Sequence, residues 1–426
     1  MTAKLHTLAL LLALSNSSWA SLQTSCPSDA LNPFRSPSLC PLLIDDDTPS
    51  PFPPNQPWTH RPYCEVVTGK EDTQTQFCVY SSSAFNIGSE LSVLTTPETA
   101  AALAPALSNF TSQWGARAHL AEKGTVFGYA DDSKPYTVIK IPGRGMGVVA
   151  TRKIKQFETI MTNFPVVIVD SELFPAEEGE KGNEGARELF DVMFEQLGDK
   201  ERLLSAARSR GSGVHVIEDA VRTNAFGLSL NERRAKGFFP EIARMNHACD
   251  PNAFPRFTAR DLAMSAVATR DILPGEEITI SYIPVGMSST YRQKSLANWH
   301  FNCTCALCSA PAQAIEASDA RREQIVELFY GMQDPSTTYE SLIEMTKEFI
   351  ELAQVERLIT KVGEYYQVLM KLFYEKGDPE SARRYGSAAL MFAETFSDPE
   401  GEFCVGLKDD LEIVDKVLAE NRGSRL

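Results

Sequence analysis

The 426-residue sequence is poor in long apolar runs and in basic charge. No later segment approaches the roughly 18 uninterrupted apolar residues that a membrane-spanning helix needs, and the N-terminal apolar run is too short, so we expect no membrane span. Lys and Arg number 41 against 56 Asp and Glu, which gives a net charge of -15. Because binding to phosphates requires a basic surface, we expect no direct nucleic-acid binding. An acidic surface suits a basic partner, although it also serves solubility alone.

The first twenty residues, MTAKLHTLALLLALSNSSWA, have the pattern of a signal peptide. Lys4 precedes an apolar run, and small residues occupy Ser18 and Ala20 before a cleavage site that would follow Ala20. The sequence therefore predicts the secretory pathway or secretion. If the start is misassigned, or the run is a buried helix, the alternative is the cytoplasm or nucleus.

Residues 21–123 form a Pro- and Ser-rich, cysteine-containing N-terminal region. Proline excludes helix and central strand from DDDTPSPFPPNQP (45–57), so this stretch is predicted to be an extended linker. Apolar spacing over 91–123 predicts helix. In the secretory pathway, four cysteines would form two disulfides, with three pairings open. These four are Cys26, Cys40, Cys64 and Cys78.

The rest of the chain predicts an α+β fold. Within 124–310, the stretch 136–170 is rich in β-branched residues punctuated by Gly and Pro, which is typical of short strands, and the same texture returns at 261–283. Residues 171–213 interrupt them as an acidic, helical insertion. Residues 311–426 show helical spacing throughout and predict hairpins that resemble tetratricopeptide units, with Asp378 as an N-cap before Pro379.

A C-x-C-x-x-C run, FNCTCALC, places Cys303, Cys305 and Cys308 close together. Three thiolates are one short of a closed, tetrahedral zinc site. We choose Cys249, in RMNHACDPNA (244–253), as the fourth ligand, with Cys404 as the alternative. The other interpretation is that these residues are disulfides or buried free thiols.

Three motifs in order resemble the SET-domain protein lysine methyltransferases. They are RMNHACDPNA, GEEITISY (275–282) and RQKSLANWHFNCTCALC (292–308). The resemblance covers roughly residues 136–310, and it is nearest to the SET and MYND type found among fungal SET-domain proteins. It implies a β-rich SET domain with a pseudoknot-like core and a post-SET zinc cluster, followed by the helical C-terminal domain.

The resemblance also implies a cofactor, S-adenosyl-L-methionine. GRGMG (143–147) lacks the G-x-G-x-x-G order of a dinucleotide fold, and its glycines would let the backbone approach a ligand closely. TNAFGLS (223–229) resembles the family segment whose asparagine faces the cofactor. Phe301 matches the aromatic residue that stacks on the adenine. The other implied contacts are Arg144, Met146, Asn224, Asn246 and His247.

Tyr282 matches the tyrosine that closes the family's active site. Methyl transfer needs a neutral amine, whereas the pKa of a free lysine is near 10.4. A narrow apolar channel and the charged sulfonium both disfavour the ammonium form, so alignment and desolvation would supply most of the acceleration. We therefore expect a protein-lysine N-methyltransferase whose partner is a protein substrate presenting a lysine, with structural Zn²⁺. The alternative is a non-catalytic SET-fold module that uses its helical C-terminal domain as a docking surface.

The sequence departs from the SET and MYND pattern in three ways. The 171–213 insertion contains no cysteine, so a MYND zinc finger is absent from it. Phe157-Glu158 stands where the family has Gly-Glu after the first strand pair. The signal peptide and the four extra cysteines imply a compartment where a cytosolic cofactor is not obviously at hand.

Overall fold

The computed structural model describes residues 57–68, 73–86, 89–105, 107, 134–174, 184–209, 214–299 and 301–423. The predicted signal peptide, Cys26 and Cys40 lie outside these ranges. None of the helices within them is both long and apolar enough to cross a membrane. The chain divides into two compact units. Among the described residues, the sheet unit comprises 57–246 and Pro255–Ile278, and the helical unit comprises His247–Phe254 and 279–423.

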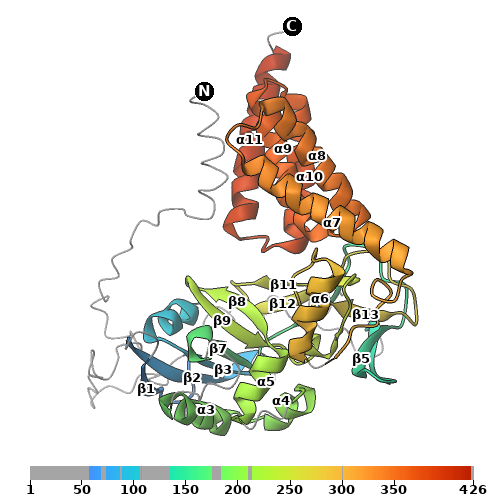
Figure 1. Cartoon of the computed structure of the whole chain (residues 1–426). Coiled ribbons are helices and arrows are strands. Elements are labelled where there is room, and N and C mark those ends of the chain that lie inside the picture. Colours follow the sequence, from blue (N-terminus) through green and yellow to red (C-terminus); the bar gives the residue numbers. More distant parts are fainter. Residues whose placement is uncertain are drawn as a thin grey trace. The chain divides into compact units, whose positions relative to one another are not determined.

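The largest sheet of the sheet unit has six strands in the order β1-β2-β3-β7-β9-β8 (Figure 1). They are β1 (Tyr63–Thr68), β2 (Gln74–Asn86), β3 (Ser89–Thr95), β7 (Val167–Asp170), β8 (Phe226–Leu230) and β9 (Arg233–Phe238). β3 pairs in parallel with β7, so the N-terminal region and the segment after residue 124 share one sheet. The division that we expected at residue 124 therefore does not mark the edge of this sheet.

The start of the helix expected over 91–123 is wrong. Leu91 and Leu94 lie on strand β3 and are fully buried. Within the described residues of that stretch, helix begins only at Pro97 and extends over 97–105. A strand covered on both faces carries a near-continuous apolar run, which spacing alone does not distinguish from a helix. Pro97 then suits the first turn of the helix that follows.

One of the open disulfide pairings is settled by strand register. β1 and β2 are antiparallel, and Cys64 lies opposite Cys78. The two residues form a disulfide. Of the two disulfides predicted for the N-terminal region, the one within the described residues is thus a cross-link between neighbouring strands.

Two smaller sheets carry the motifs. A four-stranded sheet has the order β10-β13-β5-β4, and a three-stranded sheet the order β11-β12-β6. Strands β4 and β5 form a hairpin whose turn contains Gly143 at φ 72° and Gly145 at φ 74°, a backbone region that favours glycine. The strands are β4 (Tyr136–Ile141), β5 (Gly145–Ala150), β6 (Thr159–Asn163), β10 (Asn246–His247), β11 (Ala253–Thr258), β12 (Ala263–Ala268) and β13 (Glu277–Ile280).

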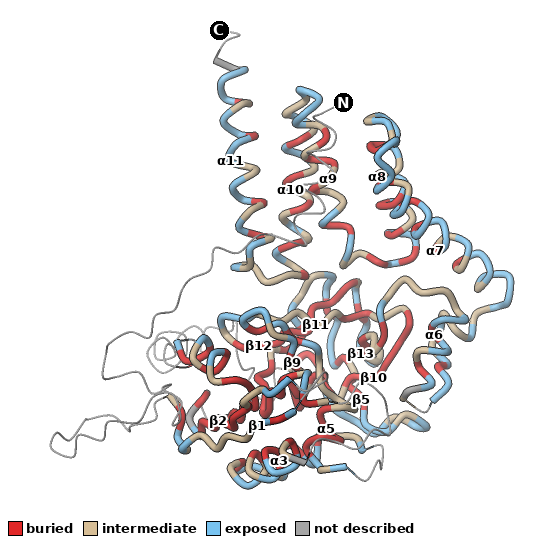
Figure 2. Tube along the Cα trace, turned by 60° about the vertical axis from the view of Figure 1, so that its left-hand side comes forward, coloured by how far each residue is buried: buried red, intermediate tan, exposed pale blue. Residues whose placement is uncertain are grey.

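The insertion supplies helices that pack on the six-stranded sheet. These are α3 (Glu184–Gln196) and α4 (Lys200–Ala206), followed by α5 (Val216–Asn224). Leu189, Phe190 and Met193 of α3 join Val167 and Phe238 of the sheet in one apolar core. Figure 1 shows α3 and α5 along one side of this sheet, and Figure 2 shows buried segments in the strands that they cover.

The helical unit contains α6 (Ser289–Leu296), α7 (Ala312–Gln333), α8 (Tyr339–Val355), α9 (Val362–Glu375), α10 (Pro379–Phe396) and α11 (Glu402–Gly423). Consecutive helices from α7 to α11 pack against each other, as the expected hairpins require. Asp378 caps α10 by accepting the backbone N–H of Ser381, and Pro379 opens the helix, as predicted. The helical C-terminal region and the β-rich region before it are confirmed.

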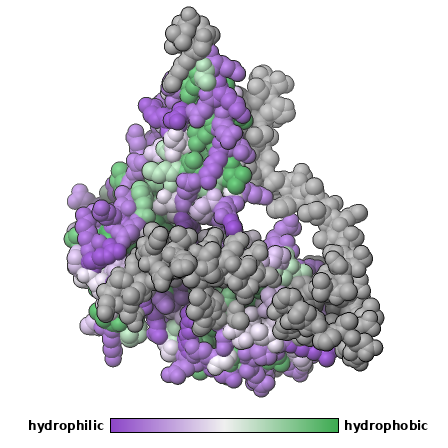
Figure 3. All heavy atoms as spheres, turned by 180° about the vertical axis from the view of Figure 1, so that it is seen from behind, coloured by the Kyte–Doolittle hydropathy of each residue, from purple (hydrophilic) through white to green (hydrophobic). Residues whose placement is uncertain are grey.

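Most of the chain's net negative charge lies in the C-terminal helical region. Residues 312–423 hold 12 basic and 23 acidic side chains, a net charge of -11 out of -15 for the whole chain. In Figure 3 hydrophilic residues cover much of the visible face of the helical unit, with hydrophobic patches between them. The acidic surface suggested by composition is therefore concentrated in one region.

Candidate functional site

In the sheet unit, the β4–β5 hairpin approaches Asn246 closely because Gly147 has no side chain. A Cβ atom at Gly147 would lie 2.8 Å from Asn246 Nδ2 and 3.1 Å from Glu277 Oε1, and it would also collide with Ile141. Any larger residue would push the hairpin away. The glycine-rich stretch thus serves a close approach within the protein, besides any approach to a ligand.

Glu277, the first residue of β13, holds two of the predicted cofactor contacts. Its Oε2 atom forms a 2.7 Å ion pair with Arg144 Nη1, and its Oε1 atom accepts a 2.8 Å hydrogen bond from Asn246 Nδ2. Asn246 is 3% exposed and also donates through Nδ2 to the carbonyl oxygen of Met146 at 3.2 Å. Arg144, Met146 and Asn246 are thus brought together by a carboxylate that the sequence analysis did not single out.

The side chain of Asn224, the last residue of α5, forms hydrogen bonds to nearby backbone groups. Its side chain accepts from the backbone N–H of Arg208 at 2.9 Å and donates to the carbonyl oxygens of Arg208 and Ala220, at 2.9 and 2.8 Å. Its amide therefore anchors the backbone at Arg208. In turn, Arg208 Nη2 donates to the carbonyl oxygen of Met146 at 3.1 Å and to Asn246 Oδ1 at 2.7 Å.

Glu277 and Arg208 are the two residues of this group that sequence reasoning missed. Glu277 is the second glutamate of GEEITISY, so the motif itself held a signal for it. Arg208 lies in the insertion and in none of the quoted motifs, and only the fold brings it to Asn246.

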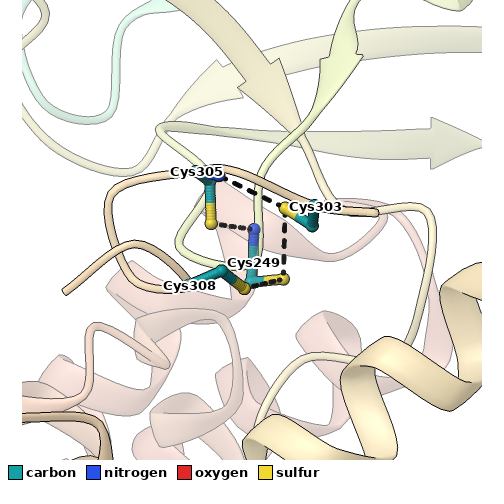
Figure 4. Close-up of side chains that lie close together, drawn as sticks. All are labelled: Cys249, Cys303, Cys305 and Cys308. Carbon is teal, nitrogen blue, oxygen red and sulfur yellow. Dashed lines mark hydrogen bonds between the residues drawn. The ribbon is translucent and has the colours of Figure 1, made fainter. Parts of the chain in front are cut away.

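In the helical unit, the four cysteines chosen as metal ligands lie together (Figure 4). Their sulfur atoms are all within 4.8 Å of one another. The Sγ atom of Cys249 is 3.8 Å from that of Cys303 and 3.5 Å from that of Cys308. Four sulfurs at the usual Zn–S distance on a tetrahedron are about 3.8 Å apart. The cluster therefore fits a closed four-thiolate zinc site, and all four residues are free thiols.

Cys404, the alternative ligand, belongs to a different environment. It lies on α11 and is completely buried in an apolar cluster with Ala382, Leu407 and Val414. Cys404 therefore packs as a small apolar side chain.

The thiols of the cluster shift one another's pKa values in opposite directions. Hydrogen bonding to Cys303 and then to the other two thiols raises the pKa of Cys249. Hydrogen bonding from Cys249 and then from its neighbours lowers the pKa of Cys305. Four thiolates this close repel one another, so full deprotonation needs a compensating ion.

His247 links this cluster to Tyr282. Its Nδ1 atom accepts the backbone N–H of Tyr282 at 3.0 Å, which places the ring proton on Nε2. Nε2 then lies 3.2 Å from Cys249 Sγ. Since both ring nitrogens face protein atoms and the residue is 2% exposed, the side chain of His247 is a structural bridge. Any contact of His247 with a cofactor would use its backbone.

Aromatic rings gather around Tyr282. Its ring centroid is 5.4 Å from that of His247, 6.5 Å from that of Phe301 and 6.1 Å from that of Trp299. Phe301 is 37% exposed, so part of its ring remains open to a ligand. Trp299 was missed, although it lies in a quoted motif two residues before Phe301. The cluster offers an apolar surface with one phenol group.

Most of these candidate residues lie within the part of the chain that matches a known family. Residues 145–283 match the family model described as SET domain. The chain carries a SET domain. The matched range includes Met146, Asn224, Asn246, His247 and Tyr282, and the three remaining cysteines and Phe301 follow it.

Relatives of this SET domain are named as lysine methyltransferases. Histone-lysine N-methyltransferase set5 of Schizosaccharomyces pombe is 30% identical over 201 residues, which cover 46% of this chain and 57% of the relative. Human histone-lysine N-methyltransferase SMYD3 is 42% identical over 136 residues, or 30% of each chain. Zebrafish (Danio rerio) N-lysine methyltransferase SMYD2-B is 31% identical over 125 residues, which cover 29% of this chain and 26% of the relative. The predicted resemblance to SET-domain lysine methyltransferases is confirmed. The matched segments span little more than half of the first relative and less than a third of the others.

Proposed function

We propose that this chain is an S-adenosylmethionine-dependent protein-lysine N-methyltransferase. The SET domain and the printed activities of its relatives support the reaction class. The observation that carries the proposal is the ring cluster of Tyr282, Trp299 and Phe301, tied through His247 to the thiol cluster. This combination supplies an apolar wall and a phenol, which the transfer of a methyl group to an amine requires.

Each unit, taken by itself, offers groups that suit one part of this cofactor. S-adenosylmethionine would supply a methyl group on a positively charged sulfur. In the sheet unit, Arg208 Nη2 donates to both the carbonyl oxygen of Met146 and Asn246 Oδ1. Two acceptors that bind one cationic nitrogen also suit the α-ammonium group of an amino acid. In the helical unit, the open part of the Phe301 ring fits the flat face of an adenine.

Tyr282 and its aromatic neighbours would prepare the lysine. An apolar wall disfavours the charged ammonium form and so lowers the pKa of an inserted lysine. The phenol oxygen of Tyr282 can then accept a hydrogen bond from the amine and direct its lone pair. Acceleration would come mainly from alignment in a site that excludes water.

We assign the thiol cluster a structural Zn²⁺ ion. With four thiolate ligands the ion would have no open position for a substrate or a water molecule. Its role would be to fix Cys249, and through it His247 and the backbone of Tyr282. The ion would also hold the segment that bears Phe301, which is two residues before Cys303.

The substrate in this proposal is a protein segment that presents a lysine in basic surroundings. The charge of -11 over 312–423 favours such a partner by electrostatic attraction. The secretory location remains a prediction from the first twenty residues, and the distribution of a C-terminally tagged protein tests it.

The decisive experiment joins binding to methyl transfer. Titration calorimetry of the zinc-loaded full chain with S-adenosylmethionine should show saturable binding, and a lysine-rich protein should acquire labelled methyl groups. Tyr282→Phe should lower the transfer rate roughly a hundred-fold with little change in cofactor affinity, because misalignment costs rate rather than binding.

Tyr291→Phe is the matched control, since Tyr291 is 66% exposed on α6 and its phenol is not part of the ring cluster. Its transfer rate should equal that of the wild type. Absence of cofactor binding in the wild-type protein would overturn the proposal and favour the non-catalytic docking module.

A further inference from the structure

Arg208 occupies a pair of hydrogen-bond acceptors in the sheet unit. One nitrogen, Nη2, donates to both the carbonyl oxygen of Met146 at 3.1 Å and Asn246 Oδ1 at 2.7 Å. Both acceptors are uncharged. A single cationic nitrogen with two donor hydrogens therefore satisfies them together.

An α-ammonium group could satisfy the same acceptors. It carries a positive charge and three N–H donors, so two can point at these oxygens in place of Nη2. Met146 is 36% exposed, so solvent reaches this residue, whereas Asn246 is buried at 3% exposed. The acceptors are fixed by their own partners, since Asn246 also bonds to Glu277.

The backbone of Arg208 is anchored while its side chain is long. Asn224 holds both the N–H and the carbonyl oxygen of Arg208 at 2.9 Å. The guanidinium can therefore leave the acceptor pair by side-chain rotation and remain within a few ångströms of it. An α-carboxylate lies one carbon atom from its ammonium, so both groups would be within reach of this residue.

A second guanidinium, that of Arg244, lies near Arg208. Burial, and then the positive charge of Arg208, lower the pKa of Arg244. The two like charges are therefore near enough to act on each other unfavourably. Arg144 is already paired with Glu277 at 2.7 Å. A ligand carboxylate would relieve the repulsion and form a two-bond pair with a guanidinium.

We propose that Arg208 recognises the amino-acid end of the cofactor. In the empty protein its guanidinium fills the acceptor pair, and on binding it yields this pair to the α-ammonium and bonds to the α-carboxylate. The proposal rests on the proposed function, because it takes S-adenosylmethionine as the ligand. It gives the insertion a role in cofactor selection that its sequence does not reveal.

Calorimetry with two ligands tests this role. S-adenosylmethionine carries the carboxylate, and its decarboxylated form, S-adenosyl-3-(methylsulfanyl)propylamine, lacks it. Arg208→Ala should weaken S-adenosylmethionine binding roughly 10- to 100-fold, the usual worth of a hydrogen bond to a charged group. The decarboxylated ligand should bind Arg208→Ala at least as tightly as wild type, because the competing side chain is gone.

Two further variants keep the test interpretable. Arg208→Lys keeps the charge without the planar fork and should give an intermediate affinity for S-adenosylmethionine. Arg202→Ala removes the same charge from α4, six residues earlier, and should leave both affinities unchanged. Zinc content and far-ultraviolet circular dichroism equal to wild type establish that each variant is folded.

Each outcome decides the proposal. A loss that is equal for both ligands, or no loss for either, overturns carboxylate recognition by Arg208 while cofactor binding by the wild type upholds the proposed function. A gain in affinity for both ligands shows that Arg208 only blocks the acceptor pair, which also overturns it. If the wild type binds neither ligand, the inference and the proposed function fall together.

Discussion

The candidate residues of the two units are held by different kinds of bonds. In the sheet unit, one carboxylate and two amides hold Arg144, Asn246 and Arg208 through hydrogen bonds and an ion pair. In the helical unit, His247 and the chain before Cys303 are anchored on four sulfur atoms. The first arrangement is complete with protein atoms alone. The second brings together four thiols whose spacing suits a cation, so the two groups should respond differently to metal removal.

Removal of the metal should give the largest effect. With a chelator, or in Cys305→Ser, the thiols lose the ion that offsets their repulsion, and the binding energy of a structural zinc is of order 10 kcal/mol. We expect zinc content to fall below one ion per chain. Cofactor affinity should fall more than about 100-fold, because Phe301 and Tyr282 lose their anchor.

Cys404→Ala is the control for this prediction. It removes a buried sulfur that lies outside the cluster, so zinc content should remain at one ion per chain. If Cys305→Ser also kept its zinc and its cofactor affinity, the distinction between the two groups would fail.

Loss of the Glu277 carboxylate in the sheet unit should give the second-largest effect. Glu277→Gln removes the charge that pairs with Arg144 and weakens the acceptor that orients Asn246. We expect cofactor affinity to fall roughly ten-fold, which is the lower end of the range for a hydrogen bond to a charged group. Zinc content should remain unchanged. Titration calorimetry and metal analysis measure the two quantities.

The neighbouring glutamate provides the control. Glu276 pairs with Arg270 and accepts the backbone N–H of Leu273, away from Asn246. Glu276→Gln should lower stability without a comparable loss of cofactor affinity. Equal losses of affinity in both variants would mean that the turn as a whole, rather than Glu277, positions the group.

The turn before Glu277 has a counterpart elsewhere in the sheet unit. ATRKIKQFETI (150–160) and ATRDILPGEEI (268–278) fold alike: Ile154 and Ile272 exchange backbone hydrogen bonds. The backbone N–H of Phe157 bonds to the carbonyl oxygen of Ala268 and that of Gly275 to Ala150, each at 2.8 Å. Phe157-Glu158 thus makes the same turn as Gly275-Glu276, with φ 68° at Phe157 and 82° at Gly275.

These two turns give the smallest predicted effect. Gly275→Ala should lower the free energy of unfolding by about 1 kcal/mol, since nothing crowds the new Cβ and the cost is that of a positive φ. Phe157→Gly should change it by less, because relief of the same cost is offset by the burial lost with the ring. Urea unfolding monitored by fluorescence compares them. A larger loss in Phe157→Gly than in Gly275→Ala would show that the ring, rather than the backbone, governs its turn.

Local patterns in the sequence were sufficient for the thiol cluster and the C-terminal helices. C-x-C-x-x-C brings three sulfurs together whatever the rest of the chain does, and the search for a fourth ligand led to Cys249. Helix caps such as Asp378 act through neighbours two or three residues away, so their effect follows from sequence. The strand at 89–95 was missed because burial on both faces removes the alternation that marks a strand, and β3 forms only by pairing with β2 and β7.

By itself, the sequence determined the family resemblance, the members of the thiol cluster and the helical C-terminal region, because each depends on short motifs or spacings along the chain. Only the tertiary structure decided that Glu277 joins Arg144 to Asn246, that Asn224 anchors Arg208, and that both nitrogens of His247 face protein atoms. Apart from the contact of His247 with Cys249, two positions away, these contacts join residues that are 16 to 133 positions apart. Their geometry depends on strand register and helix packing, which no local pattern specifies.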